Sequence, residues 1–233
     1  MSYVERLVVS PLVACTWERT TTSRRELRIV PDACVDLIWS GERLSIAGPD
    51  TKARVVTLAP GARVVGVRLR PGMAGAVLGV PASELRDCTP EVVEVLGYEV
   101  AAPLLEALAA GVDPHRRLLR AVQERGVHEP DPLVGAAVAA LGQPRARVSA
   151  VAGELGVSAR QLQRIVSAAA GYGPKLLARV LRFRRLQALA PAPLVELALE
   201  AGYADQAHMT AEVRLLAGVS PVRFFKDRSP TAA

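Results

Sequence analysis

Arginine and glutamine side chains cluster in the segment SARQLQRIVSAAAG, residues 158–171. If this segment is a helix, its apolar residues recur at inward-facing positions. The outer face then carries four polar side chains: Arg160, Gln161, Gln163 and Arg164. An arginine donates two hydrogen bonds to O6 and N7 of guanine, and a glutamine pairs with N6 and N7 of adenine. We therefore predict a helix that reads DNA bases, against the alternative of an ordinary solvated helix face.

A second segment of similar design, DQAHMTAEVRLLAG, spans residues 205–218. Asp205 is expected to cap a helix that turns its apolar residues inward. His208 is expected to contact the DNA backbone or to pack against the helix, and we predict no metal site beside it. Glutamine and threonine have good base-reading chemistry and alanine does not. The predicted outward set is Gln206, Ala207 and Thr210.

The two segments are the second halves of an internal repeat. Residues 151–174 and 195–221 each predict a helix, a glycine-containing turn and a second helix, which is the helix-turn-helix pattern. The predicted N-caps, Ser158 and Asp205, fall in register. Helices are predicted over residues 132–141, 149–155, 159–170, 174–189, 194–201, 205–217 and 221–226.

Two such units joined by a helix, each ending in Gly-x-(Gly/Ser)-Pro, resemble the DNA-binding domain of the AraC/XylS family of bacterial transcription regulators. The resemblance covers roughly residues 131–228. It implies two recognition helices that enter successive major grooves, with base contacts at Arg160, Gln163 and Arg164. The passage LAPAPLV (189–195) looks a few residues shorter than in the family, and Ala211 stands where arginine is common.

Positive charge is concentrated in the same half of the chain. Residues 146–233 hold 12 basic and six acidic side chains, whereas residues 1–145 hold 17 of each, so the whole excess of +6 lies beside the repeat. Binding to a phosphate backbone requires such an excess. A plain surface charge is the alternative for each residue. The predicted phosphate contacts are Ser158, Lys175, Arg179, Arg182, Arg185, Arg214 and Arg223.

The N-terminal part has a different pattern, of short β-type runs separated by turn residues. After one or two strands before Thr22, runs are found at 27–30, 33–39, 43–48, 54–58 and 63–70. Their close spacing predicts an antiparallel meander that closes into a small barrel, followed by helices from about residue 73 onward. The motifs PDACVDLIW, SIAGPD and VGVRLRPG also look like the small barrel domain of some actinobacterial regulators.

The fold class is therefore α+β. We expect an N-terminal β-barrel-like effector or dimerisation domain with a helical tail over residues 1–127, and an all-α DNA-binding domain over residues 128–233, with HEPDP (128–132) at the junction.

Alternation along the predicted strands suggests a small effector pocket. Asp36 is expected to meet Arg68 or Arg70, either inside this pocket or as a structural salt bridge at the barrel mouth. Cys34 is expected to be a buried thiol, with a redox or alkylation sensor as the minority alternative. No histidine lies in the strand region, which argues against a metal-binding barrel. The predicted pocket set is Cys34, Asp36, Trp39, Arg68 and Arg70.

These patterns predict a non-enzymatic transcription regulator without cofactor or metal. No uncharged apolar run of ~18 residues is present, so we expect a cytoplasmic protein with no membrane partner. The three cysteines have wide spacings that do not suggest a disulfide framework. The expected partners are double-stranded DNA, an unknown small effector, RNA polymerase and a second copy of the chain. The competing class is a thiol-using DNA-repair or stress-sensing enzyme with an attached DNA-binding domain.

Overall fold

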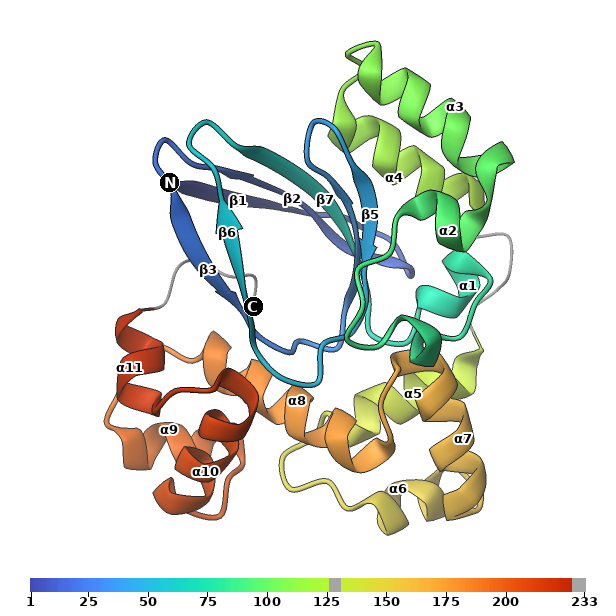
Figure 1. Cartoon of the computed structure of the whole chain (residues 1–233). Coiled ribbons are helices and arrows are strands. Elements are labelled where there is room, and N and C mark those ends of the chain that lie inside the picture. The colour runs from blue at the N-terminus through green and yellow to red at the C-terminus, as the bar shows by residue number, and fades with distance from the viewer. Residues whose placement is uncertain (126–130, 228–233) are drawn as a thin grey trace.

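The structure, a computed structural model, describes residues 1–125 and 131–227 (Figure 1). Within residues 1–125, seven strands form two antiparallel sheets. One has the order β1-β2-β7-β4-β5, and the other pairs β3 with β6. The strands are β1 (Ser2–Leu7), β2 (Val13–Thr20), β3 (Arg25–Ile29), β4 (Val35–Trp39), β5 (Leu44–Ala47), β6 (Arg54–Leu58) and β7 (Arg63–Leu69).

The predicted barrel-like arrangement is confirmed, but the predicted meander is wrong. Only β1–β2 and β4–β5 are hairpins of consecutive strands, because β7 is inserted between β2 and β4 and β3 pairs with β6. The reason lies in burial. Val65, Val67 and Leu69 of β7 are buried on one face, and Arg68 is largely covered on the other, so β7 suits a central position. Strand β6 is exposed at alternate residues and suits an outer sheet.

The five-stranded sheet packs its outer face against helices. Trp39 of β4 and Val67 of β7 belong to a core completed by Leu104, Leu118 and Val122. Residues 82–85 form a 3₁₀ turn after Pro81, without a side-chain cap, where a helix was expected. The covering elements are α1 (Ala74–Leu78), the 3₁₀ turn η1 (Ala82–Leu85), α2 (Val92–Leu96), α3 (Tyr98–Ala109) and α4 (Pro114–Arg125).

The helices predicted for the C-terminal part are confirmed to within one residue at each end. Helix α8 packs in a second core with residues of both helix-turn-helix units, including Leu162 and Met209. Each second helix ends at a glycine in the left-handed conformation, Gly171 (φ 75°) and Gly218 (φ 70°). The helices are α5 (Pro132–Leu141), α6 (Val148–Glu154), α7 (Ala159–Ala170), α8 (Pro174–Ala188), α9 (Leu194–Ala201), α10 (Gln206–Ala217) and α11 (Pro221–Lys226).

The loop between β5 and β6, residues 48–53, touches both helix-turn-helix units, and we call it the bridging segment. In the first unit, the Tyr172 hydroxyl donates a hydrogen bond to the carbonyl of Asp50. In the second unit, the Leu216 carbonyl accepts from the backbone N–H of Ala53 at 2.7 Å. The barrel side of the molecule therefore contacts the C-terminal ends of α7 and α10 at once (Figure 1).

The predicted domain boundary at residues 127 and 128, with His128, lies outside the described residues and stays a prediction. None of the helices in the described part of the chain has the length and apolar character that a membrane crossing requires.

Glu18 of β2 links the sheet to helix α4 through its side-chain contacts. Its carboxylate accepts hydrogen bonds from Arg63 Nε at 2.8 Å and contacts His115 Nε2 at 2.9 Å. Hydrogen bonding first from Arg63 and then from His115 lowers the pKa of Glu18 from 4.5 to about 2. A carboxyl whose pKa is lower in the folded state stabilises the fold above its unfolded pKa and loses this contribution as the pH falls.

We expect Glu18→Gln to lower the free energy of unfolding at neutral pH by about 1–2 kcal/mol, after allowance for solvent screening. The difference between native protein and variant should shrink between pH 4.5 and about 2, because the native carboxylate becomes protonated over this range. Urea unfolding across this pH range measures the difference in the free energy of unfolding. Glu26→Gln, at an exposed position of β3, is the control and should change little. A pH-independent difference would contradict the prediction.

Candidate nucleic-acid interface

Helix α7 is held by a cap at its start and by apolar packing along one face. The Ser158 hydroxyl accepts from the Gln161 N–H at 3.2 Å, and the Gln161 side chain accepts from the Ser158 N–H at 3.0 Å. This reciprocal pair satisfies two backbone donors at the helix start. Leu162 and Val166 are buried, so the opposite face of α7 is directed outward. Gln161 is thus used in the cap, which makes it a weaker base-reading residue than its neighbours.

The exposed face of α7 presents two arginines one helical turn apart. Within the described residues, neither Arg160 nor Arg164 makes a hydrogen bond or an ion pair, and both are exposed. Gln163 is also exposed and donates to Ser167 Oγ at 3.0 Å. Because an unpaired guanidinium can donate to a base without first breaking another contact, these arginines are the best-placed base readers of the first unit.

Helix α10 presents a less polar face. Asp205 accepts from the His208 N–H at 2.7 Å and caps the helix as predicted. Gln206 and Ala207 are exposed, and Thr210 is partly exposed. Compared with α7, this helix offers one amide and one hydroxyl and no arginine near its N-terminus.

His208 is fixed within the second unit. Its Nδ1 accepts from the backbone N–H of Ala204 at 3.3 Å, and its Nε2 lies 3.4 Å from Glu212. Glu212 lies four residues farther along the same helix and was not predicted as a partner of His208. The described residues contain no group of three side chains that could hold a metal ion, so the contact is a local ion pair or hydrogen bond.

The six basic residues among the predicted phosphate contacts fall into two groups, and the seventh predicted contact, Ser158, caps α7 with its hydroxyl. Arg179 and Arg182 of α8 form ion pairs with the buried carboxylate of Glu212, at 2.9 and 3.0 Å. Arg185 donates to the carbonyls of Ala201 and Gly142, at the ends of α9 and α5. These three arginines hold helices together, which limits their reach to DNA. The remaining cations, all exposed, are Lys175, Arg214 and Arg223, the last paired with Asp227.

The barrel holds a cavity lined by three of the five residues that were predicted for an effector pocket. Asp36 and Arg68 are cross-strand neighbours, and two hydrogen bonds of 3.0 and 2.9 Å join them. They line a cavity of about 260 Å³ between the two sheets, together with Cys34. Burial raises the pKa of the Asp36 carboxyl, while the Arg68 guanidinium and the Trp17 indole N–H oppose this shift.

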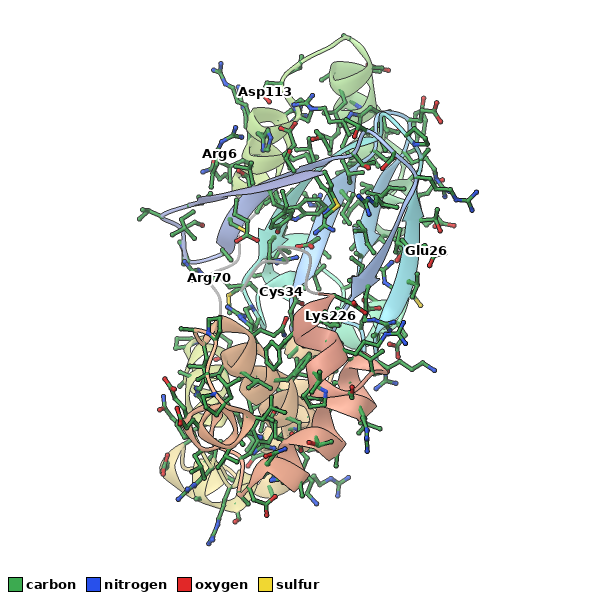
Figure 2. The ribbon with its side chains drawn as sticks, turned by 90° about the vertical axis from the view of Figure 1, so that its left-hand side faces the viewer. Arg6, Glu26, Cys34, Arg70, Asp113 and Lys226 are labelled. Carbon is green, nitrogen blue, oxygen red and sulfur yellow. The ribbon has the colours of Figure 1, made fainter. Side chains whose placement is uncertain are left out.

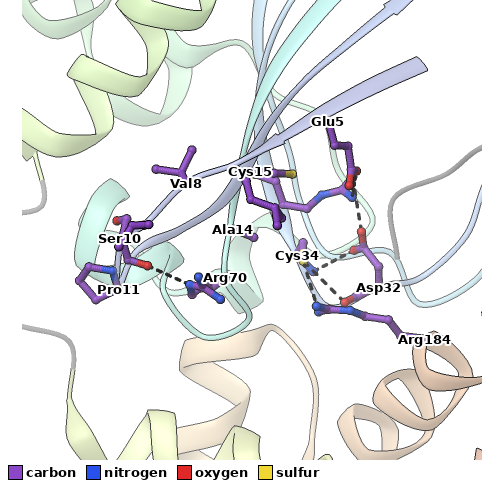
Figure 3. A pocket seen from close by; sticks show the side chains of 13 residues that line it. Glu5, Val8, Ser10, Pro11, Ala14, Cys15, Asp32, Cys34, Arg70 and Arg184 are labelled. Atoms are coloured by element: carbon purple, nitrogen blue, oxygen red, sulfur yellow. Dashed lines mark hydrogen bonds and ion pairs between the residues drawn. The ribbon is translucent and has the colours of Figure 1, made fainter. Parts of the chain in front are cut away.

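Trp39 and Arg70 do not line this cavity. Trp39 points to the other face of β4 and belongs to the core beneath the helices. Arg70 follows the end of β7 and donates to the carbonyl of Ser10 at 3.0 Å. It lines a second cavity, of about 660 Å³, where the barrel meets Arg184 of α8 (Figures 2 and 3). The Arg184 guanidinium lies 3.9 Å from Cys34 Sγ, and burial raises the pKa of this thiol well above its usual value.

Three cavity residues of the first two strands escaped the sequence analysis. Tyr3, Trp17 and Arg19 line the smaller cavity, with the Arg19 guanidinium 4.6 Å above the ring of Tyr3. The signal was present in the alternation along β2, where Trp17 and Arg19 share a face. The sequence before Thr22 predicts only one or two strands and a loop, so it does not assign these residues to one face.

Two capped helix-turn-helix units on a shared helix, with a basic face on one recognition helix, define a DNA-binding protein. Residues 151–227 match the family described as "Helix-turn-helix domain", and residues 6–91 match the "Domain of unknown function (DUF6597)". Residues 151–227 therefore form a helix-turn-helix domain, which supports DNA binding, and a DUF6597 domain over residues 6–91 lies in front of it.

Several solved structures are similar to this chain. The C-terminal domain of AraT, a response regulator from Geobacillus stearothermophilus, shares 24% identity over 44% of this chain and 93% of that one, with a TM-score of 0.40. ToxT from Vibrio cholerae shares 9% identity over 93% and 98%, with a TM-score of 0.48. Wild-type ToxT with an unsaturated fatty acid bound shares 8% identity over 99% and 97%, with a TM-score of 0.47. The search of curated proteins gave no significant match.

Proposed function

We propose that this regulator binds a specific DNA sequence in the cytoplasm by placing α7 and α10 in successive major grooves. The observation that carries the proposal is the pair of exposed, unpaired arginines on α7, Arg160 and Arg164, within a confirmed helix-turn-helix unit. The bridging segment contacts the C-terminal ends of α7 and α10, and Arg160 and Gln206 in the first turns of these helices are exposed, which leaves the first turns accessible to DNA. RNA polymerase and a second copy of the chain complete the proposed partners.

The two units are proposed to work unequally. The first reads bases through Arg160, Gln163 and Arg164, and the second mainly grips the backbone, since its outer face has one amide and one hydroxyl. Lys175, Arg214 and Arg223 remain the proposed phosphate contacts, because the side chains of Arg179, Arg182 and Arg185 are engaged within the domain.

The proposed regulation runs through the bridging segment. Asp50 lines the cavity and also accepts the hydrogen bond from Tyr172 of the first unit. Three residues farther along, Ala53 contacts the second unit at Leu216. An effector in the cavity that moved this segment would therefore act on both units together.

The burial of the thiols disfavours the competing enzyme class. Burial raises the pKa of Cys15 to about 12 and that of Cys34 well above its usual value, so both stay protonated at neutral pH. The thiolate is the nucleophile in thiol chemistry. The remaining thiol, Cys88, is exposed outside both cavities described above. A thiol titration that found a reactive Cys34 near neutral pH would reopen this class.

Binding-site selection with the full chain tests the function, and the salt dependence of binding tests the backbone contacts. The affinity for the selected DNA should fall steeply with salt, and Lys175→Ala should reduce the log–log slope by about one, because one phosphate contact is lost. The control is Arg116→Ala on α4, an exposed cation outside the helix-turn-helix units. An affinity that does not respond to salt, or an equal effect of both variants, would contradict the proposed interface.

A further inference from the structure

The cavity between the two sheets has mainly apolar walls. Leu27, Val56 and Leu58 line it from β3 and β6, and Ile38 and Val64 line it from the larger sheet. A volume of about 260 Å³ suits a small organic molecule rather than a peptide or a polymer.

Charged side chains also line the cavity, but they are already paired. Asp36 holds Arg68 through two hydrogen bonds, with Asp32 at 3.5 Å from the same guanidinium. Arg54 also pairs with Asp50, because its Nε lies within hydrogen-bond distance of both carboxylate oxygens, at 3.2 and 2.9 Å.

The remaining cation of the lining, Arg19, stacks over the ring of Tyr3. The lining therefore holds three guanidinium groups and three aspartates. An ionic ligand would add a net charge to this balanced, buried set or would break one of its pairs, and both are costly. This balance favours an uncharged ligand.

One polar group of the lining is left over. The indole Nε1 of Trp17 is buried and has no hydrogen bond of normal geometry within the described residues, although its N–H helps to hold the nearby Asp36 carboxylate in its charged form. The Trp17 ring packs directly on Gly66 of the neighbouring strand β7, so closely that an added Cβ at Gly66 would lie 2.4 Å from it. This packing keeps the indole on the cavity side of the sheet. Each Asp36 oxygen already accepts from Arg68, so the indole N–H is only a minor partner of this carboxylate. A buried donor without a partner is uncommon, and a ligand acceptor can satisfy it.

We propose that this cavity binds a small uncharged carbonyl compound, whose apolar body packs between the sheets and whose oxygen accepts a hydrogen bond from Trp17. This inference rests on the proposed effector site and adds the chemical class of its ligand. It predicts discrimination by charge and by the presence of one acceptor, both of which can be measured with probes of matched size.

The test uses the full chain and four probes: acetophenone, ethylbenzene, benzoate and benzylamine. The chain has two tryptophans, so Trp39→Phe assigns the indole N–H resonance of Trp17 in an NMR spectrum. Acetophenone should shift this resonance downfield with saturation. Ethylbenzene, which has no acceptor, should bind about 2- to 12-fold more weakly, as for one net hydrogen bond. Benzoate and the benzylammonium ion should bind at least ~10-fold more weakly, because each buries an unpaired charge.

Two matched substitutions locate the site. Val56→Phe should abolish binding of all probes by filling the cavity, whereas Val55→Phe, on the exposed face of β6, should leave it intact. Tighter binding of either ion, no saturable shift with millimolar acetophenone, or equal effects of the two phenylalanines would overturn the inference. Affinity for the selected DNA is measured on the same samples. If that affinity persists while probes fail, the ligand class is wrong and the DNA-binding function stands; if specific DNA binding is absent, the proposed function itself is wrong.

Discussion

Replacing Arg164 with alanine is expected to weaken binding to the preferred DNA site by about 5- to 150-fold, which corresponds to ~1–3 kcal/mol for a lost bidentate guanine contact. Arg164 is exposed on α7 and has no partner within the described residues, so its loss leaves the fold intact. The preference for one base pair should be relaxed, and the other positions should keep theirs. Binding-site selection on the native chain and the variant measures both effects.

Two variants of the second unit serve as comparisons. Gln206→Ala should cost less than Arg164→Ala, because a single amide is removed from a less polar face. Ala211→Arg should tighten binding to many sequences, since it adds a donor at an exposed position of α10. Equal information content in the two half-sites that the native protein selects would show that both units contribute equally to base reading. An unchanged base preference after Arg164→Ala would remove this residue from the interface.

Replacing Glu212 with alanine is expected to destabilise the second helix-turn-helix unit by about 3–5 kcal/mol, the typical cost of breaking a buried ion pair on one side. The Glu212 side chain is only 9% exposed and receives both Arg179 and Arg182. Its removal leaves the largely buried Arg182 without a counter-ion between α8 and α10. Thermal or urea unfolding followed by circular dichroism should show the loss.

Glu200→Ala is the matched control, because Glu200 is an exposed carboxylate of α9 with no ion pair in the described part of the chain. It should change the free energy of unfolding by less than ~0.5 kcal/mol. If Glu212→Ala had the same free energy of unfolding as the native chain, the ion pairs of Glu212 would not stabilise this unit. Arg179 and Arg182 would then again be candidates for phosphate contacts.

The helices of the DNA-binding part could be predicted because their signals are local. Caps such as Ser158 and Asp205 and terminal glycines such as Gly171 lie within a few residues of the helix that they start or end. The order of the strands could not be predicted, because the pairing of β2 with β7 joins residues about 50 positions apart. Turn residues show where strands end but not which strand becomes the neighbour.

The candidate sites show the same limit. Alternation along two strands was enough to predict that Asp36 meets Arg68 or Arg70, and the structure pairs it with Arg68, the one of the two that lies within a regular strand. The role of Arg182 could not be predicted in this way, because its partner Glu212 lies 30 residues away on another helix. A basic residue on a DNA-binding domain can thus be a helix-helix contact, and only the folded arrangement separates the two roles.

The bridging segment also has a consequence for the operator. The segment contacts the first unit at Tyr172, just after α7, and the second unit at Leu216 of α10. We therefore expect it to fix the separation of the two recognition helices. On B-DNA, one extra base pair between two half-sites moves the second by ~3.4 Å and rotates it by about a tenth of a turn around the duplex. With this separation fixed, binding should tolerate base pairs inserted between the two half-sites poorly. An effector that released the segment would change the half-site spacings that the protein accepts and not the bases that it reads.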